Sequence, residues 1–396
     1  MSTQKTNFDS LRQLVVTDFD VETWDVTEAV LSAHATLLLQ GQSGGIGLVI
    51  TGPSGSGKTT VLKFLEGLEE MVYRSDDVTP ASFVSHDSSK TEEQLKKVDL
   101  LPKIKHKTLL SRDMATWFAG DQEAVYKRMS IMAPLMDGDG YTRDTGSHGQ
   151  RGYVGSDYRF NFIGATTPLS PRAWQVMGTV GNRLVFHEKR GSSDTAAVVD
   201  DVIGGSDYGK RVARCREAVH AVLTELWNTY GGVGQADLEA PSDDRVRDVL
   251  GYLTELVQAA RAPIVDGTPQ REGGHRIAHS LFSIAQGHAL LCGRQQATIE
   301  DMQVCGRIAL STMPNDRRPI VRALVDPAGT GTLTGQMIEA VADVTRPTAH
   351  KRMKLLTTLG IATCSESETD GRETKILSVN EVYRWPNGLD FSICWS

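Results

Sequence analysis

Residues 52–59 read Gly52-Pro53-Ser54-Gly55-Ser56-Gly57-Lys58-Thr59, and this stretch decides the fold of the chain. It matches the pattern G-x-x-x-x-G-K-[ST]. The apolar run at residues 46–50 predicts a buried strand before it, and residues 60–65 predict a helix after it. In a loop between a strand and a helix, successive backbone N–H groups converge on phosphate oxygens. The sequence therefore predicts a phosphate site for a nucleotide.

Two side chains of this loop carry the predicted chemistry. Lys58 supplies a mobile positive charge for the β- and γ-phosphates, and the hydroxyl of Thr59 is a ligand for Mg²⁺. Because the helix that follows begins at the same point, we expect every residue from Gly52 to Thr60 to contribute to the nucleotide site.

The composition excludes several classes of protein. The 396 residues allow two to three domains, and 40% of them are hydrophobic, which is ample for real cores. No apolar stretch approaches the roughly 20 residues of a membrane span, and residues 1–9 lack the apolar core of a secretory signal. We therefore expect a soluble, cytoplasmic protein without a membrane partner.

Cysteine usage and charge narrow the class further. The five cysteines form no C-x-x-C or Cys/His pair, which argues against a disulfide framework and against a zinc site. The net charge is −7, so the surface as a whole does not attract polyanions. Contact with nucleic acid would need a local basic patch.

The order of predicted elements divides the chain into four parts. Residues 1–45 are a lead-in with a helix at 27–39, and residues 46–205 alternate between helices and strands, which favours a parallel sheet covered by helices. The expected strands are 48–51, 81–85, 108–111, 160–164 and 183–186. Residues 206–314 predict an α-helical lid with helices at 209–229, 244–260, 275–292 and 299–313, the last capped by Thr298 and Asp301. Residues 315–396 form a compact C-terminal unit. The expected fold class is α/β.

Four further stretches follow the loop in a fixed order. The first is the strand at 108–110 with Ser111-Arg112-Asp113 after it, and the second is the strand at 158–164 that ends in Ala165-Thr166-Thr167-Pro168. The third is Asn182-Arg183-Leu184-Val185-Phe186, and the fourth is the helix at 275–291, which carries Arg276.

With the phosphate loop, these stretches resemble an AAA+ ATPase of the MCM-like branch with a C-terminal winged helix-turn-helix domain. The resemblance covers about residues 46–385 and implies ATP and Mg²⁺ as ligands. It implies that Asp113 holds the metal or polarises the attacking water, and that Thr167 contacts the γ-phosphate or that water. It also implies that Arg183 acts on the nucleotide of a neighbouring subunit. Arg276, on the lid, would close over the nucleotide bound by its own chain. Lys58 completes this catalytic set.

Asp113 leaves an alternative open. It is the only acid at its strand end, so a second carboxylate would have to come from elsewhere, such as Asp121 or Glu123. The other interpretation is that Asp113 caps the helix predicted after it.

The Gly-rich interval at residues 136–153 corresponds in the MCM-like branch to an insert and hairpin that reach DNA. Asp137 and Asp139 resemble the start of a calcium loop, but Tyr141 and Thr142 stand where its third ligand and its glycine belong. The resemblance implies that Arg143, Arg151 and Tyr153 contact DNA, and a solvated surface loop is the alternative.

The C-terminal unit holds the basic patch. Residues 333–341 and 346–359 predict two helices joined by a tight turn, and residues 360–379 predict a hairpin, which is the outline of a winged helix. From residue 344 to 365 the chain has no acid but has four cations, Arg346, Lys351, Arg352 and Lys354, so we expect them to bind DNA. The acidic hairpin, with Glu366, Glu368 and Asp370, favours the alternative of a protein partner.

The sequence thus predicts an ATP-binding and ATP-hydrolysing protein that acts on DNA as a helicase or translocase, in a ring such as a hexamer. Only 45 residues precede the nucleotide domain, so we do not expect the processive action of replicative MCM proteins. One alternative is an initiator or loader of the Orc/Cdc6 type, which uses ATP as a switch. The other is a regulatory or defence ATPase whose winged helix contacts proteins.

Overall fold

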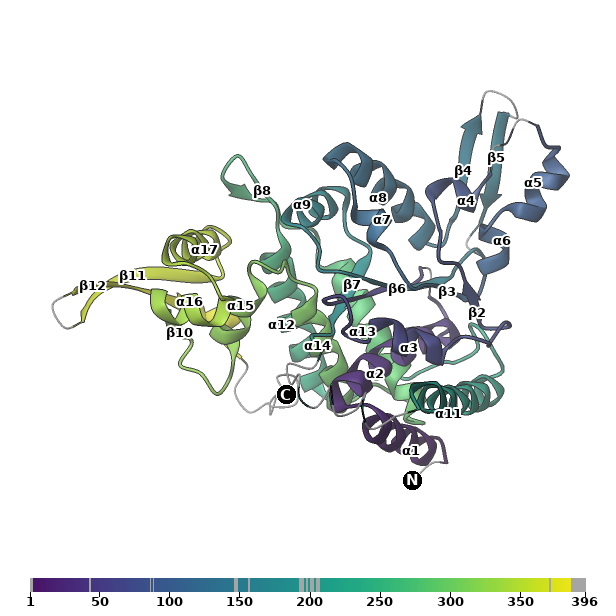
Figure 1. Cartoon of the computed structure of the whole chain (residues 1–396), viewed down its shortest axis with the longest axis horizontal. Coiled ribbons are helices and arrows are strands. Elements are labelled where there is room, and N and C mark those ends of the chain that lie inside the picture. Colours follow the sequence, from purple (N-terminus) through teal and green to yellow (C-terminus); the bar gives the residue numbers. More distant parts are fainter. Residues whose placement is uncertain are drawn as a thin grey trace.

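The computed structural model describes residues 3–385, apart from residues 43, 86, 88, 146–148, 156, 192–195, 197, 198, 200–202, 204–206, 370 and 371. A five-stranded parallel sheet lies at its centre, between two layers of helices (Figure 1). Its strands are β1 (Gly47–Thr51), β2 (Val72–Arg74), β3 (Thr108–Ser111), β6 (Asn161–Thr166) and β7 (Leu184–Glu188). The α/β class is therefore confirmed.

The strand order is β2-β3-β6-β1-β7, so β6 lies between β1 and β3. Because all pairs are parallel, the carboxyl ends of the strands lie at one edge of the sheet. Thr51 pairs with Thr166, and Ser111 pairs with Gly164. The segments that follow β1, β6 and β3 are therefore neighbours at that edge.

Side-chain alternation explains why both faces are covered. Leu48 and Ile50 of β1 belong to one hydrophobic cluster, whereas Val49 belongs to a second one on the opposite face. The second cluster contains residues of short helices and of two longer ones, which are α4 (Pro80–Phe83), α6 (Leu101–Ile104), α7 (Ala115–Phe118), α8 (Gln122–Met136) and α9 (Pro171–Val180). Helix α5 (Glu92–Val98) lies farther out, near the hairpin of β4 (Gly140–Thr145) and β5 (Gly149–Val154).

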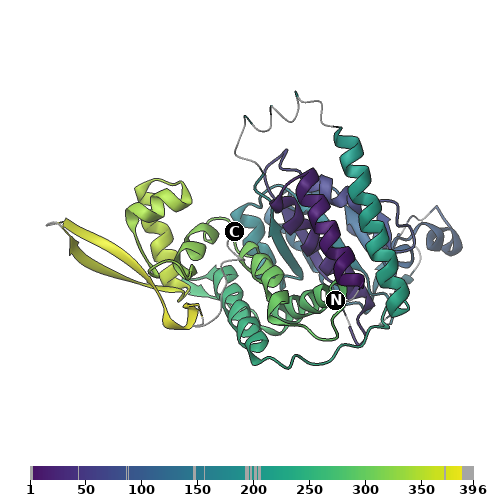
Figure 2. The same cartoon turned by 90° about the horizontal axis from the view of Figure 1, so that it is seen from below.

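The first cluster joins the N-terminal segment to the predicted lid (Figure 2). Its helices include α1 (Thr3–Asp18), α2 (Val21–Ala35), α3 (Lys58–Phe64), α11 (Tyr208–Tyr230), α12 (Asp244–Arg261), α13 (His275–Leu291) and α14 (Met302–Ser311). Helices α2 and α13 pack so closely that a Cβ on Gly287 would lie 2.1 Å from the carbonyl oxygen of Ser32. The lead-in is thus part of the core, and its second helix begins earlier than the expected residue 27.

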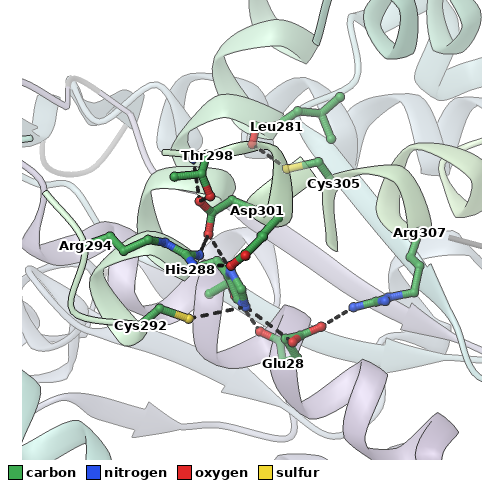
Figure 3. A network of polar contacts seen from close by, with 11 residues as sticks. Glu28, Leu281, His288, Cys292, Arg294, Thr298, Asp301, Cys305 and Arg307 are labelled. Atoms are coloured by element: carbon green, nitrogen blue, oxygen red, sulfur yellow. Dashed lines mark hydrogen bonds and ion pairs between the residues drawn. The ribbon is translucent and has the colours of Figure 1, made fainter. Parts of the chain in front are cut away.

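A buried polar network fastens the same helices together (Figure 3). His288 of α13 contacts Asp301 Oδ1 at 2.6 Å and Glu28 Oε1 of α2 at 3.3 Å. Arg294 pairs with Asp301, and Arg307 of α14 pairs with Glu28. Groups of opposite charge thus face one another inside the protein, and the network ties together α2, α13 and α14 on one face of the sheet.

Most predicted helices of the lid match the structure closely. The 3₁₀ turn η2 (Ile299–Asp301) precedes α14, and the predicted cap is present, since the backbone N–H of Thr298 donates to Asp301 Oδ2 at 2.7 Å. A small hairpin of β8 (Ile264–Val265) and β9 (Thr268–Pro269) separates α12 from α13.

One predicted strand is wrong. Residues 81–85 were expected to form a strand, but Pro80–Phe83 is a helix whose cap is Thr79. Pro80 lies in the first turn of this helix, where its missing N–H costs nothing. The strand of this region is β2, a three-residue edge strand that pairs with β3.

The C-terminal unit extends away from the sheet (Figure 1). It begins with α15 (Arg318–Val325) and contains α16 (Gly335–Ala342), α17 (Arg346–Thr358) and η3 (Glu381–Tyr383). Its antiparallel sheet has the order β10-β12-β11, formed by β10 (Thr332–Thr334), β12 (Arg372–Val379) and β11 (Ala362–Thr369). Ala349, Met353 and Leu356 are buried, so α17 packs against the rest of the unit through an apolar face. Asp370 lies outside the described residues.

None of the helices in the described part of the chain is long and apolar enough to cross a membrane.

Candidate functional site

A pocket of about 520 Å³ opens at the carboxyl edge of the sheet. Lys58 and Thr59 reach it from the start of α3, Asp113 from the segment after β3, and Thr167 from the segment after β6. Its full lining is Ser54, Gly55, Gly57, Lys58, Thr59, Lys63, Asp76, Arg112, Asp113, Ala165, Thr166 and Thr167. Three predicted catalytic residues, Lys58, Asp113 and Thr167, therefore share one pocket with the predicted metal ligand Thr59, because β6 lies between β1 and β3.

Glycine is required in the loop for two physical reasons. Gly55 and Gly57 have φ angles of 82° and 83°, a backbone conformation that residues other than glycine rarely adopt. A Cβ on Gly52 would lie 2.0 Å from the carbonyl oxygen of Lys189, so a larger residue cannot fit there. The loop thus folds tightly beside the pocket, and it ends where α3 begins.

Lys58 is held inside the loop. Its Nζ donates to the carbonyl oxygens of Gly52 at 2.8 Å and Pro53 at 2.6 Å. Burial lowers the pKa of Lys58, and the nearby charge of Asp113 opposes that shift. A phosphate oxygen is a charged acceptor and makes a stronger hydrogen bond with an ammonium group than a carbonyl does. Lys58 is therefore poised beside the pocket for an anion.

The other predicted loop residues differ in their roles. The hydroxyl of Ser56 is buried and has no hydrogen-bond partner among the residues that the structure describes, and the same holds for Thr51 at the end of β1. Such orphaned polar atoms are costly unless a ligand or water satisfies them. Thr60 does not line the pocket, since its hydroxyl lies 2.9 Å from the hydroxyl of Tyr208.

Oxygen donors for Mg²⁺ are present at the pocket. Thr59 offers a hydroxyl and Asp113 a carboxylate, both of the type that Mg²⁺ prefers. The described residues hold no group of three or more His, Cys, Asp or Glu side chains that could bind a metal by themselves. Phosphate oxygens and water would complete the shell of a bound ion, as is usual for Mg²⁺.

Asp113 lies at the pocket and also beside α7, whose N-cap is Met114 and not Asp113. It lines the pocket, and its Oδ1 also accepts a hydrogen bond from the backbone N–H of Ala115 at 2.8 Å, at the start of α7. The expected second carboxylate is not supplied by Asp121 or Glu123. Asp121 caps α8 through the N–H of Ala124, and neither residue lines the pocket.

Sequence reasoning missed three charged residues of the pocket, Lys63, Asp76 and Arg112. Asp76 follows β2, the strand that the sequence did not reveal, and Arg112 precedes Asp113. The Arg112 guanidinium donates to Asp76 from Nε at 3.0 Å and from a terminal nitrogen at 2.7 Å. Arg112 was visible as a cation at the end of a predicted strand, whereas no sequence signal pointed to Asp76.

Arg183 and Arg276 lie at the opposite edge of the sheet. Arg183 directly precedes β7, whose first residue pairs with Gly47 at the start of β1, and both arginines line a second pocket of about 330 Å³. The five residues of β1 at about 3.3 Å each separate this edge from the loop by roughly 16 Å. Arg276 therefore does not line the pocket beside the loop of its own chain, where the resemblance led us to expect it.

The hairpin at residues 140–154 exists, but two of its expected DNA contacts are engaged elsewhere. Arg151 is buried and pairs with Asp99 at 3.0 Å, and the hydroxyl of Tyr153 donates to the same carboxylate at 2.8 Å. Asp99 is fully buried. These residues fasten the hairpin to the α5–α6 segment, which favours a structural role for them over the contact with DNA that the resemblance implies. Arg143 is half-buried on β4.

Three of the four basic residues of α17 face solvent. Arg346, Lys351 and Lys354 are exposed and Arg352 is half-buried. They share a helix whose opposite face packs on α16 and β11. The arrangement gives the C-terminal unit a cationic surface.

No protein-family model matches the chain, and no curated protein matches it in sequence. The class that the fold and the pocket define is an α/β protein with a parallel sheet between helices, compatible with a P-loop fold.

Proposed function

We propose that this chain is an AAA+ ATPase of the MCM-like type that binds and hydrolyses ATP with Mg²⁺ and acts on DNA. One observation carries the proposal: Lys58, Thr59, Asp113 and Thr167 line one pocket at the carboxyl ends of β1, β3 and β6. In open α/β sheets ligands bind at this edge.

The chain's own residues have separate tasks in the proposed reaction. Backbone N–H groups of the loop bind the phosphates, and Lys58 places its charge between the last two of them. Thr59 and Asp113 hold Mg²⁺, which neutralises phosphate charge when bound. The hydroxyl of Thr167, opposite the loop, orients the terminal phosphate or the attacking water.

Completion of the site needs a second copy of the chain. Arg183 and Arg276 lie at the edge away from the loop, so each can reach only the nucleotide of a neighbour. Their guanidinium groups are close together, because a Cβ on Gly181 would lie 2.8 Å from Arg183 and 3.0 Å from Arg276. A ring such as a hexamer, in which this edge faces the next loop, would bring both cations to the transferred phosphoryl group.

DNA is the proposed substrate of movement. The cationic side of α17 carries Arg346, Lys351, Arg352 and Lys354 in a protein that is acidic overall. Phosphate contacts by such residues supply most non-specific affinity for DNA. A protein partner for the same unit is the alternative.

A switch function is the second candidate, and a specific observation favours it. Among the described residues that line the pocket, Asp113 and Asp76 are the carboxylates, and Asp76 is already paired with Arg112. A site short of a general base hydrolyses ATP slowly. The protein would then resemble an initiator or loader of the Orc/Cdc6 type, or a regulatory or defence ATPase.

The rate of ATP hydrolysis with and without single- and double-stranded DNA separates these functions. A motor hydrolyses ATP faster when DNA is present. An initiator turns over slowly and binds DNA more tightly with ATP, and a regulator binds ATP without affinity for DNA. Absence of ATP binding would refute all three.

A further inference from the structure

We propose that Arg112 binds the terminal phosphate of the nucleotide in its own chain and that Asp76 positions it for this task. This inference rests on the proposed function of the pocket and adds a residue that the family resemblance does not supply. It concerns the end of β3, where the sequence offers Asp113 as the only acid and Arg112 stands beside it.

The position of Arg112 follows from the strand order. The loop leaves the sheet after β1 and Arg112 leaves it after β3, with β6 between them. The loop and Arg112 are separated by two strand spacings, a distance of about 10 Å. A phosphate chain that starts in the loop and runs across the end of β6 therefore has Lys58 on one side and Arg112 on the other. Both side chains line the same pocket.

The orientation of Arg112 is fixed by a two-point contact. Asp76 accepts hydrogen bonds from Nε and from one terminal nitrogen of Arg112, at 3.0 and 2.7 Å. A guanidinium has five N–H donors, so this contact leaves the other terminal nitrogen for a further acceptor. The nearest acid to that nitrogen is Glu66, at 3.8 Å, which is too long for a hydrogen bond.

The same carboxylate serves a second arginine, which provides a matched control. Arg74 pairs with Asp76 at 2.6 Å, but Arg74 does not line the pocket. Hydrogen bonds from Arg112 and Arg74 hold the pKa of Asp76 well below its usual range. Asp76 is therefore ionised at neutral pH and remains paired with Arg112. The cluster thus presents one arginine to the pocket and keeps the other outside it.

Discrimination between ATP and ADP tests the inference. Fluorescent ATP and ADP are titrated into the full chain with Mg²⁺. The ratio compared among variants is the dissociation constant for ADP divided by that for ATP, so that a loss of ATP preference lowers the ratio. Since a hydrogen bond to a charged group contributes about 1.5–3 kcal/mol, Arg112→Ala should weaken ATP binding about tenfold or more and change ADP binding little. Asp76→Asn should shift the ratio in the same direction. Arg112→Lys should restore only part of the loss, because an ammonium cannot make the two-point contact.

Arg74→Ala should leave the ratio unchanged. The inference is overturned if Arg112→Ala leaves the ratio unchanged while Lys58→Ala still abolishes binding, or if Arg74→Ala lowers the ratio as much as Arg112→Ala. Retained ADP binding shows that Arg112→Ala is folded. If the wild-type protein binds neither nucleotide, the proposed function itself fails, which is a different result from Lys58-dependent binding with an unaltered ratio.

Discussion

Arg183 holds Asp137 through two nitrogens of its guanidinium, Nε at 3.2 Å and a terminal nitrogen at 2.9 Å. This pair lies at the amino-terminal edge of the sheet, across the domain from Lys58. Asp137 is partly exposed, so the pair can exchange partners with a phosphate on a neighbouring copy. In the proposed ring, Asp137 would hold Arg183 in place until the nucleotide of a neighbour reaches it.

Arg183→Ala should abolish hydrolysis and leave nucleotide binding almost unchanged, because the loop that binds the phosphates belongs to the other edge of the domain. Removal of an arginine finger lowers the rate about 10³-fold or more. Phosphate release and equilibrium binding of a fluorescent nucleotide measure the two properties. Equal loss of both would refute a role in a neighbour's site.

Mixing two inactive variants tests whether the site is shared between chains. In a mixed ring, an Arg183→Ala chain offers an intact loop to a Lys58→Ala neighbour that still has its Arg183. Mixtures should therefore recover part of the ATPase rate that neither variant has separately. A mixture as inactive as its components would show that Arg183 and Lys58 do not act across an interface.

Lys351→Glu with Arg352→Glu should weaken DNA binding and make it less sensitive to salt. Loss of two phosphate contacts lowers the slope of log K against log salt concentration by about two. Fluorescence anisotropy with labelled duplex at several salt concentrations gives this slope. The double variant Lys97→Glu, Arg247→Glu makes the same change of charge on exposed helix positions elsewhere and should have little effect. Unchanged affinity in the first variant would remove α17 from the DNA interface.

His288→Gln should destabilise the protein most strongly in mild acid. Burial lowers the pKa of His288, but hydrogen bonds to Asp301, Cys292 and Glu28 outweigh burial and raise the pKa well above 6.5. A raised pKa contributes stability that is full below the unfolded value and is lost as the pH rises through the folded value. Breaking such a buried pair costs about 3–5 kcal/mol.

The stability difference between wild type and His288→Gln should therefore shrink as the pH rises above 6.5, as urea unfolding measures it. The pKa of Glu28, a carboxylate that pairs with His288, is shifted in the opposite direction. Burial raises the pKa of Glu28, but His288 and Arg307 lower it to about 2, so its contribution is lost only in strong acid. A difference that does not change with pH would show that His288 is uncharged in the folded protein.

Arg151→Ala should lower stability and not DNA affinity. Its partner Asp99 is fully buried, so the variant leaves an unpaired charge inside the protein, at a cost of about 3–5 kcal/mol. Thermal unfolding and DNA anisotropy on the same sample measure both effects. A folded, stable variant with weakened DNA binding would show instead that Arg151 contacts DNA.

The sequence predicted the core of the site because its signals are local. The loop is one continuous motif, and Asp113 and Thr167 each follow an apolar strand. In a parallel sheet all such positions lie at the same edge, so their meeting follows from strand direction.

The features that the sequence did not reveal depend on distant contacts. Val72–Arg74 is too short to show a period, and its stability as a strand comes from pairing with β3. The packing of α13 against α2 decides which edge of the sheet Arg276 reaches, and Gly287 gave no hint of that contact. Arg151 resembled a solvated cation because its partner Asp99 lies 52 positions earlier in the chain.

The release of phosphate from ATP by wild-type protein and by Lys58→Ala, with and without Mg²⁺, tests the central claim most directly. The account predicts hydrolysis by the wild type that requires Mg²⁺ and that Lys58→Ala abolishes, because no other cation is held by the carbonyls of the phosphate loop in the described part of the chain. Hydrolysis that persists in Lys58→Ala, or none in the wild type with or without DNA, would contradict it.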